Sequence, residues 1–481
     1  MKKILITLTL LVVIHTITFS QKWIDTTYTI QLTKDIAYGS SIDFAGTTRT
    51  HLLNICVPTN DIVPTCGRPL LLAIHGGAFL AGNKDGDQIP LWVSEFAKRG
   101  YTTASINYRL GMFQTNSLVN CNVSLLGFPW NCLNMQDTSE WYRGAYRGMQ
   151  DAKGALRYLI AHASQYQIDP RNVFIVGESA GAFIALETAF LDDSIEKYDQ
   201  ASALNNVSAP NSIYENQCIQ TPGFATNIAA MQLNRPDLGS IEGDMNTSTL
   251  PYQIKGVGSF YGAMFKNLFT NYTYTQAPVL YMYHQPNDLV VPYDEGRVES
   301  GVSYCATQFP FNCQYLINLP MIYGSKGIKK MIDNMAGSGI PLPTYHFDTT
   351  TNFTDCVGQL ANPSLAGHSV DNSTLRSKNM AILFATAIDT SGFCAPNKID
   401  ETSLPNRVTI SPNPISHSFV IHGITEKICQ VEVFDFNGRI IFSTTHIPSS
   451  NQIQVPGMVR GNYFVKIQGD KRVYYSKLMK E

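Results

Sequence analysis

The sequence contains little charge, no long cluster of basic residues and neither of the short motifs that commonly bind zinc. Asp, Glu, Lys and Arg make up 15% of the 481 residues, below the roughly 25% of an average globular chain, and the formal net charge is −2. We therefore expect no nucleic-acid partner, because binding a polyanion relies on positive patches. Neither Cys-x-x-Cys nor His-Glu-x-x-His occurs, which argues against a zinc site. The 44% of hydrophobic residues is enough for a buried core, which excludes a disordered chain.

The first 20 residues follow the pattern of a secretory signal peptide. Lys2 and Lys3 precede an apolar stretch that is broken by polar residues and ends at Ser20, and it is too short for a comfortable membrane span. No later segment is predicted to span a membrane. Export favours disulfides among the ten cysteines, with buried free thiols as the alternative. Proximity in sequence suggests three short loops and a looser fourth pair: Cys56 with Cys66, Cys121 with Cys132, Cys305 with Cys313, and Cys356 with Cys394.

Between residues 21 and 396, short apolar segments alternate with longer segments of helical periodicity. The short segments are bounded by Gly, Pro or Asn, so they predict buried strands of a mostly parallel sheet. Helices between such strands cover both faces of the sheet, and the pattern predicts one α/β domain whose first two strands are antiparallel. The predicted strands are 28–32, 49–57, 70–75, 102–108, 173–177, 255–260, 278–283 and 343–347, and the predicted helices are 89–99, 147–165, 180–191 and 373–389.

Two long segments interrupt this alternation, at about 111–142 and 192–251. Long insertions without their own periodicity usually form covers or binding loops in compact domains, although some are merely solvated. We favour a cover for the second insertion.

After residue 396 the pattern changes, and 397–406 is predicted to be a linker. Seven short β-rich segments follow within 407–481, and Asn437-Gly438 between two of them is a strong hairpin-turn signal. This density of short strands predicts a small all-β sandwich as a separate domain.

The sharpest local feature is Gly177-Glu178-Ser179-Ala180-Gly181, which directly follows a predicted strand and directly precedes a predicted helix. The motif alone is weak evidence. In this context, however, a sharp strand-to-helix turn lifts the serine clear of the sheet edge, and the two glycines allow the turn. Ser179 is therefore the candidate nucleophile.

A second Gly-rich segment, His75-Gly76-Gly77-Ala78-Phe79, ends an earlier predicted strand. Acyl transfer needs N–H groups aimed at the oxygen that becomes negative, and a Gly-rich loop can present them. We assign the N–H groups of Gly77, Ala78 and Ala180 to this role. The alternative is an ordinary strand-to-helix turn. Because the Gly-rich segment occurs together with the serine motif, this alternative is the weaker one.

A serine hydroxyl needs a base at neutral pH, and the base needs an acid to orient it. In a fold of this type the expected chain order is Ser, then Asp or Glu, then His. Asp288 follows strand 278–283 at the correct edge of the sheet, and we rank it above Asp294. His368 lies in a Gly-flanked loop, from which an imidazole can reach both Ser179 and Asp288, whereas His346 is expected to be packed within the last strand.

Residues 28–395 resemble the α/β-hydrolase carboxylesterase and lipase family. The resemblance is carried by HGGAF (75–79), GESAG (177–181), QPNDLVVP (285–292), AGHS (366–369), INYRLG (106–111) and MQDAKGALRYL (149–159). It implies no cofactor and the following roles: Ser179 as nucleophile, Asp288 as acid, His368 as base, and the N–H groups of Gly77, Ala78 and Ala180 as the oxyanion hole. Ala78 and Ala182 stand where the family usually has Gly. Because Ala keeps its N–H group, this departure concerns only the size of the acyl pocket.

Residues 408–481 resemble the C-terminal sorting domain of type IX secretion in certain two-membraned bacteria. The resemblance is carried by ISPNP (410–414), VFDFNGRII (433–441), GNYFVKI (461–467) and KRVYYSKLMK (471–480). It implies that the secretion machinery is a partner, that this domain is typically removed on export, and that the protein is secreted or displayed on the cell surface.

Together these features predict a secreted serine ester hydrolase that forms an acyl-enzyme with small or polymer-linked esters. Two alternatives stay open. One is a carbohydrate esterase that removes acetyl or feruloyl groups from plant polymers, which surface delivery and polar insertions favour. The other is a hydrolase-like binding protein without activity, although such proteins usually lack one member of the triad.

Overall fold

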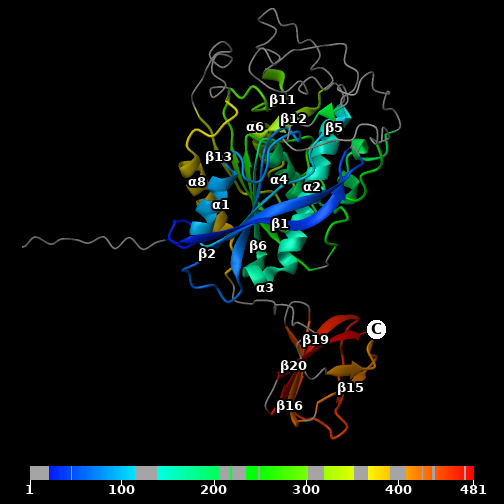
Figure 1. The fold of residues 1–481 in the computed structure, drawn as a ribbon. Helices are drawn as coiled ribbons and strands as arrows, with labels where there is room; N and C mark the ends of the chain where they lie inside the picture. The colour runs from blue at the N-terminus through cyan, green and yellow to red at the C-terminus, as the bar shows by residue number, and fades with distance from the viewer. Residues whose placement is uncertain are drawn as a thin grey trace, which may run out of the picture. The chain divides into compact units, whose positions relative to one another are not determined.

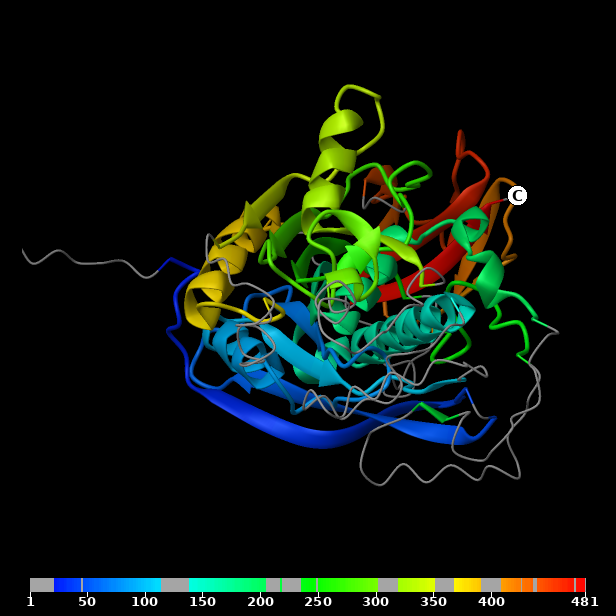
Figure 2. The same cartoon turned by 90° about the horizontal axis from the view of Figure 1, so that it is seen from above.

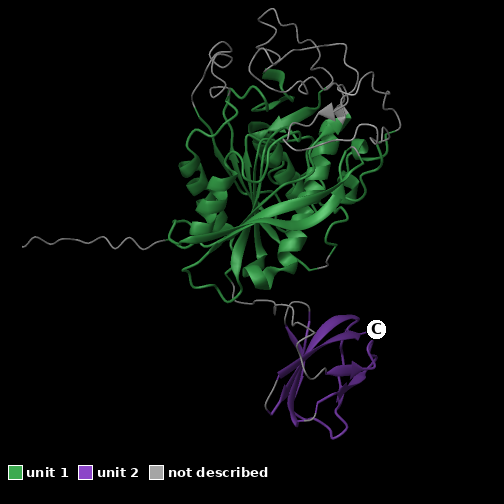
Figure 3. Cartoon of the chain, viewed as in Figure 1, with its two compact units in different colours: residues 1–395 green, residues 396–481 purple. Residues whose placement is uncertain are grey.

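The computed structural model describes the greater part of the chain. The described residues are 21–44, 46–113, 138–204, 217–218, 235–247, 250–301, 319–350, 367–390, 408–424, 426–435, 439–470 and 473–480. The predicted signal peptide and linker, the middle of both insertions and the Asn437-Gly438 turn lie outside the described residues. The chain divides into two compact units, Met1–Ala395 and Pro396–Glu481 (Figure 3).

An eight-stranded sheet forms the framework of the first unit (Figure 1), in the order β1-β2-β4-β3-β6-β8-β10-β13. β2 pairs antiparallel with both β1 and β4, and every later neighbouring pair is parallel. The predicted, mostly parallel α/β sheet is therefore confirmed. The strands are β1 (Ile30–Ile42), β2 (Thr48–Pro58), β3 (Arg68–Ile74), β4 (Thr102–Ile106), β6 (Ile168–Glu178), β8 (Ile254–Phe260), β10 (Val279–Tyr283) and β13 (Tyr345–Asp348).

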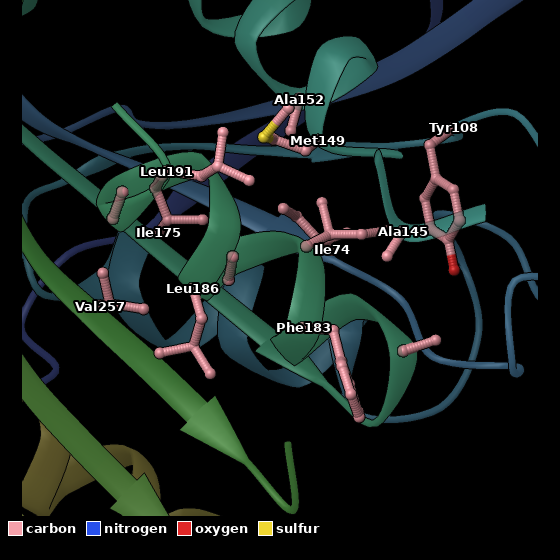
Figure 4. Close-up of a cluster of buried hydrophobic side chains, with 14 of the residues drawn as sticks. Ile74, Tyr108, Ala145, Met149, Ala152, Ile175, Phe183, Leu186, Leu191 and Val257 are labelled. Carbon is pink, nitrogen blue, oxygen red and sulfur yellow. The ribbon is translucent and has the colours of Figure 1, made fainter. Parts of the chain in front are cut away.

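Both faces of the central strands are buried. In β3, Leu70, Leu72 and Ile74 belong to one hydrophobic cluster, whereas Leu71 and Ala73 belong to another. Because side chains alternate along a strand, a strand with two buried faces is apolar throughout, as this segment is. Figure 4 shows side chains of the first cluster, which come from strands, from helices and from the segments that follow them: Ile74, Tyr108, Ala145, Met149, Ala152, Ile175, Phe183, Leu186, Leu191 and Val257.

Helices cover the two faces. α1 (Ile89–Lys98) and α8 (Ser373–Ala387) lie side by side on one face (Figures 1 and 2), and Trp92 and Phe384 of these helices are fully buried in the second cluster. α2 (Thr138–Ala161) and α4 (Ala180–Phe190) pack together on the other face. Among the described residues, the remaining helices are α3 (Ala163–Tyr166), α6 (Ser325–Asn334) and the 3₁₀ helices η3 (Ser194–Glu196) and η4 (Asp199–Ala201).

Three features differ from the sequence prediction. β1 continues to Ile42, paired with β2 through two irregularities in register, although residues after 32 lack an apolar pattern. α2 begins at Thr138 rather than 147. Its first turns bury the charged residues Glu140 and Arg143, so this part of the helix lacks the separate apolar and polar faces by which an amphipathic helix is recognised in a sequence. The sequence also does not predict α6 or two small sheets. Their strands are β5 (Met112–Phe113) with β7 (Gln217–Cys218), and β11 (Glu295–Arg297), β12 (Met321–Gly324) and β9 (Ala263–Met264).

One predicted disulfide is wrong. Cys56 is a free thiol, because it lies in β2 with its side chain buried in the second hydrophobic cluster. It therefore does not pair with Cys66. The cysteines of the other three predicted pairs lie outside the described residues.

The second unit contains two antiparallel sheets, and the predicted all-β sandwich is confirmed. One has the order β14-β15-β18 and the other β17-β16-β19-β20. Alternate residues of β19, such as Tyr463, Val465 and Ile467, are buried between them. The strands are β14 (Thr409–Ser411), β15 (Ser418–His422), β16 (Ile428–Phe434), β17 (Ile440–Thr444), β18 (Gln452–Gln454), β19 (Gly461–Gly469) and β20 (Val473–Lys480).

Candidate active site

Ser179 occupies the sharp turn between β6 and α4. Its φ and ψ are 51° and −125°, a strained backbone conformation for a residue other than Gly. A Cβ atom at Gly177 would lie 2.1 Å from the carbonyl oxygen of Gly181, and one at Gly181 would lie 2.1 Å from that of Ile74. The glycines of the GESAG motif are therefore a steric requirement of this turn.

Asp288 and His368 lie beside Ser179, although they are distant in sequence. Asp288 follows β10, and His368 precedes α8. His368 Nε2 is 2.8 Å from Ser179 Oγ, and His368 Nδ1 is 2.8 Å from Asp288 Oδ2. When Nδ1–H donates to the carboxylate, Nε2 is left to accept a hydrogen bond from the serine hydroxyl. The three side chains thus form one continuous hydrogen-bonded chain.

The Asp288 carboxylate is fully buried and accepts four hydrogen bonds. The N–H groups of Val290 and Val291 donate to Oδ1 at 2.8 and 3.0 Å. Oδ2 accepts from His368 at 2.8 Å and from a second imidazole, His284 Nε2, at 3.1 Å. Burial alone would raise the pKa of Asp288, but the charge of His368 and the hydrogen bonds from both imidazoles outweigh it and lower this pKa. The carboxylate is therefore ionised at neutral pH and held in a single orientation.

The three side chains differ in exposure. The side chain of His368 is 18% exposed and Ser179 is half-buried, whereas the Asp288 carboxylate is completely buried. A ligand can therefore reach the hydroxyl and the imidazole but not the carboxylate.

The loop after β3 packs against the turn that carries Ser179. A Cβ atom at Gly76 would lie 3.1 Å from the Cβ of Ser179. Gly77, Ala78 and Phe79 have φ values of 104°, 54° and 61°, so three consecutive residues lie in the left-handed region. Within the described part of the chain, no protein group accepts a hydrogen bond from the N–H of Gly77, Ala78 or Ala180. Unpaired main-chain donors beside a serine are available to a bound oxygen anion.

Buried side chains hold this loop. The Tyr108 hydroxyl donates to the carbonyls of His75 and Gly76 at 3.1 and 3.3 Å, and its ring stacks on the His75 imidazole at 4.4 Å. His75 Nδ1 is 2.7 Å from the Gly76 carbonyl oxygen. Burial lowers the pKa of His75 to about 4, so this histidine is neutral and structural. Phe79 anchors the other end of the loop, where its ring meets Trp141 and Phe183 edge-on.

A second polar contact lies next to the serine. Tyr261 has a φ of 40°, and its ring lies 4.6 Å from the His368 imidazole. Its hydroxyl donates to Glu178 Oε2 at 2.6 Å. Burial raises the pKa of Glu178 to about 7, and the hydrogen bond from Tyr261 offsets this only in part. The residue before Ser179 is thus linked to the imidazole through one tyrosine.

The competing candidates lie elsewhere. Asp294 pairs with Lys330 and Lys326 at 2.5 and 3.4 Å. His346 lies in β13, where its Nε2 is 2.9 Å from Asp348 Oδ1, but its side chain is 50% exposed and not packed as the sequence suggested, because β13 is an edge strand. No group of three or more His, Cys, Asp or Glu among the described residues could hold a metal ion.

Sequence reasoning missed His284 and Tyr261. His284 directly precedes the QPNDLVVP segment, and Tyr261 directly follows β8, so both lie at strand ends beside the predicted residues. Position after a strand was the available signal. The contacts of Tyr261 with Glu178 and His368, and that of His284 with Ser325, join residues far apart in the chain, which no local pattern indicates.

The described ends of the second insertion are bound to α2. Arg143 donates to three main-chain carbonyls of this insertion at 2.6 to 3.0 Å, and Arg157 donates to those of Glu242 and Met245 at 2.7 Å. The middle of the insertion, to which the predicted cover belongs, lies outside the described residues.

Comparison with known families identifies both parts of the chain. Residues 53–117 and 139–298 match the family described as BD-FAE, an α/β-hydrolase esterase family. Residues 409–481 match the secretion system C-terminal sorting domain. The chain therefore contains a domain of an α/β-hydrolase esterase family and a type IX sorting domain. Both family resemblances and the α/β-hydrolase fold are therefore confirmed.

Curated relatives of the chain include two bacterial hydrolases. A probable carboxylic ester hydrolase LipM of Mycobacterium tuberculosis is 29% identical over 157 residues, which are 32% of this chain and 29% of that protein. Phenmedipham hydrolase of Pseudarthrobacter oxydans is 31% identical over 133 residues, 27% of this chain and 21% of that protein. The chain thus spans less than a third of the length of these relatives.

The chain is also similar to solved structures of two esterases. Esterase B of Lactobacillus rhamnosis, inhibited by a tributyrin phosphonate, is 13% identical, with 74% of this chain and 86% of that chain covered and a TM-score of 0.37. Apo esterase 2 of Thermogutta terrifontis is 14% identical, with 74% and 96% covered and a TM-score of 0.34.

The sorting domain indicates where the protein is located. It indicates export to the cell surface or the surrounding medium, and recognition by the secretion machinery. In the described ranges, no helix combines the length and the apolar character needed to cross a bilayer.

Proposed function

We propose that the chain is a serine carboxylic-ester hydrolase that works through an acyl-enzyme intermediate. Ser179 is the nucleophile, His368 the general base, Asp288 the acid that orients it, and the N–H groups of Gly77, Ala78 and Ala180 form the oxyanion hole. The observation that carries the proposal is the hydrogen-bonded chain from Ser179 Oγ through His368 to Asp288, with both distances at 2.8 Å.

The first half-reaction follows from these contacts. His368 Nε2 removes the proton as Ser179 Oγ bonds to the ester carbonyl carbon, and the carbonyl oxygen becomes negative. The ionised Asp288 stabilises the imidazolium through Nδ1–H, and the unpaired N–H groups stabilise the oxyanion. When the carbon–oxygen bond to the alcohol breaks, Nε2 returns the proton to the leaving alcohol oxygen.

Hydrolysis of the acyl-enzyme repeats these steps with water. Nε2 takes a proton from a water molecule that attacks the acyl carbon, and it then returns a proton to Ser179 Oγ as the carboxylic acid leaves. Both half-reactions need an accessible hydroxyl and imidazole and an ionised, shielded carboxylate. The exposures of the three side chains support this division of roles.

The proposal is tested by steady-state hydrolysis of p-nitrophenyl esters. We expect Ser179→Ala to lower kcat by about 10⁴-fold or more while the protein remains folded. Ser94→Ala is the matched control, since the Ser94 hydroxyl lies within α1, where it donates to the Leu91 carbonyl of the same helix. Retained activity in Ser179→Ala would refute the proposal.

The substrate class is tested with a panel of esters. Short aliphatic, long aliphatic, acetylated-sugar and feruloylated-sugar esters separate a general carboxylesterase from a lipase and from a carbohydrate esterase. A ratio of kcat/KM above about 100 for one class corresponds to about 3 kcal/mol of selective transition-state binding, enough to assign specificity. A chain that bound these esters but hydrolysed none of them would be a binding protein instead.

A further inference from the structure

His284 is a second histidine on the carboxylate of Asp288. It directly follows β10, and its side chain is fully buried. Its Nε2 lies 3.1 Å from Asp288 Oδ2 and 3.0 Å from the carbonyl oxygen of Val291. Asp288 Oδ2 is also the atom that binds His368 Nδ1. One carboxylate oxygen is therefore shared by two imidazoles, only one of which reaches Ser179.

The protonation of His284 follows from its other nitrogen. The main-chain N–H of Ser325, the first residue of α6, lies 3.3 Å from His284 Nδ1, and the Ser325 hydroxyl lies 3.1 Å from it. A main-chain N–H can only donate, so Nδ1 is an acceptor and carries no proton. The proton of a neutral imidazole is then on Nε2, which faces two acceptors. The first N–H of α6, which has no partner within the helix, thus fixes the tautomer of His284.

The main chain around His284 is equally fixed. Its N–H donates to the carbonyl oxygen of Asp348 at 3.2 Å, and its carbonyl accepts from the Thr349 hydroxyl at 2.8 Å. The ring of Tyr293 meets the imidazole edge-on at 5.6 Å. His284 is therefore held by β13, by α6 and by its own loop, and it cannot follow His368 if that ring moves.

We propose that His284 is a positioning residue, which holds Asp288 Oδ2 in place for His368 through a fixed Nε2–H donor. This inference rests on the proposed serine mechanism. His368 must change its partners at Nε2 during each turnover, and a carboxylate held only by the moving imidazole could rotate with it. The N–H groups of Val290 and Val291 hold Oδ1, and His284 holds Oδ2, so both oxygens keep a donor that does not take part in the reaction.

Two substitutions separate the two nitrogens of His284. His284→Gln places an amide N–H near the position of Nε2 and keeps a donor for Asp288. His284→Asn places an amide oxygen near Nδ1, so it keeps the contact with Ser325 but loses the donor to Asp288. Both leave one buried polar group without a partner, so they carry comparable costs in stability. His346→Asn is the control, because it makes the same substitution at an exposed histidine that pairs with a different aspartate, Asp348.

We expect kcat of His284→Asn to fall about ten- to hundredfold, the value of one hydrogen bond to a charged group, with KM changed less than twofold. His284→Gln should keep kcat within about threefold of the wild type, and His346→Asn should match the wild type. Rates are divided by the fraction of sites that a phosphonate ester titrates, so loss of folded protein does not count. Equal kcat in the Asn and Gln variants, whether unchanged or reduced, overturns the proposal.

The result also separates this inference from the proposed function. If the wild type hydrolyses esters and Ser179→Ala does not, an unaffected His284→Asn overturns the inference alone. If the wild type neither hydrolyses esters nor reacts with the phosphonate, both fail. A spectrum of the full chain labelled with ¹⁵N-histidine gives a readout without turnover. His284, assigned by its loss in His284→Gln, should show the Nε2–H tautomer at pH 8, and an Nδ1–H tautomer overturns the inference.

Discussion

The hydroxyl of Tyr261 donates a 2.6 Å hydrogen bond to Glu178, the residue that precedes Ser179. The ring of the same tyrosine lies 4.6 Å from the His368 imidazole. The buried side chain of Tyr261 therefore joins Glu178, which precedes Ser179 in sequence, to His368, which lies beside Ser179 in space. The pKa of the Glu178 carboxyl group is raised.

The raised pKa of Glu178 predicts a pH-dependent stability. Burial raises this pKa to about 7 from 4.5, so the unfolded chain loses the proton before the folded one does. The stability that neutral Glu178 contributes is complete below pH 4.5 and is lost as the pH rises to about 7. We compare the unfolding free energy of Glu178→Gln with that of the wild type at each pH. This difference should favour the variant by about 3 kcal/mol more above pH 7 than at pH 4.

Urea unfolding at a series of pH values measures this difference. Glu295→Gln is the control, since it makes the same substitution at an exposed position. A constant offset between Glu178→Gln and the wild type would contradict the assignment of a buried, largely protonated carboxyl group.

Gly181 should not tolerate a side chain. A Cβ atom there would lie 2.1 Å from the Ile74 carbonyl oxygen, a main-chain atom that cannot move aside. We expect Gly181→Ala to destabilise the first unit by about 3 kcal/mol or more. Gly239→Ala has open space around it and only a φ of 81° to oppose it, so it should cost about 1 kcal/mol. Similar unfolding free energies for the two variants would show that the turn at Ser179 is not closely packed.

Ala78 tests whether the proposed oxyanion donors belong to the main chain. Its φ of 54° is one that Gly adopts more readily, and Ala78→Gly keeps the N–H group. We expect this variant to keep kcat within about threefold and stability within about 1 kcal/mol, since relief of strain and added chain entropy nearly cancel. A loss in kcat above about 100-fold, the size expected for losing one donor, would instead mean that the Ala78 methyl group is essential.

Elements that bury apolar side chains could be predicted from the sequence, whereas elements that bury polar side chains could not. The strand at 70–75 has two apolar faces, and its bounds differ from those of β3 by two residues at the start and one at the end. The start of α2 could not be predicted, because Glu140 and Arg143 are buried by partners such as Arg235 and the Pro236 carbonyl, which lie about 90 residues away. Likewise, Cys56 looked like half of a disulfide in sequence, but the sheet buries it.

Part of the candidate site could likewise be predicted from the sequence, and part could not. Ser179 and Asp288 follow predicted strands and His368 precedes a predicted helix, and the structure brings their side chains within hydrogen-bond distance. Their catalytic roles stay predictions. His284 carries no motif of its own, because its meaning depends on Ser325, 41 residues later in a helix that the sequence does not predict.

The central claim is that Ser179 is acylated through His368. Its most direct test is reaction with a p-nitrophenyl phosphonate ester, followed by intact-mass and peptide mass spectrometry. The account predicts one phosphonyl group per chain, located on Ser179, absent from Ser179→Ala and formed about 10³-fold more slowly in His368→Gln. A label on another residue, or equal labelling of Ser179→Ala, would contradict it.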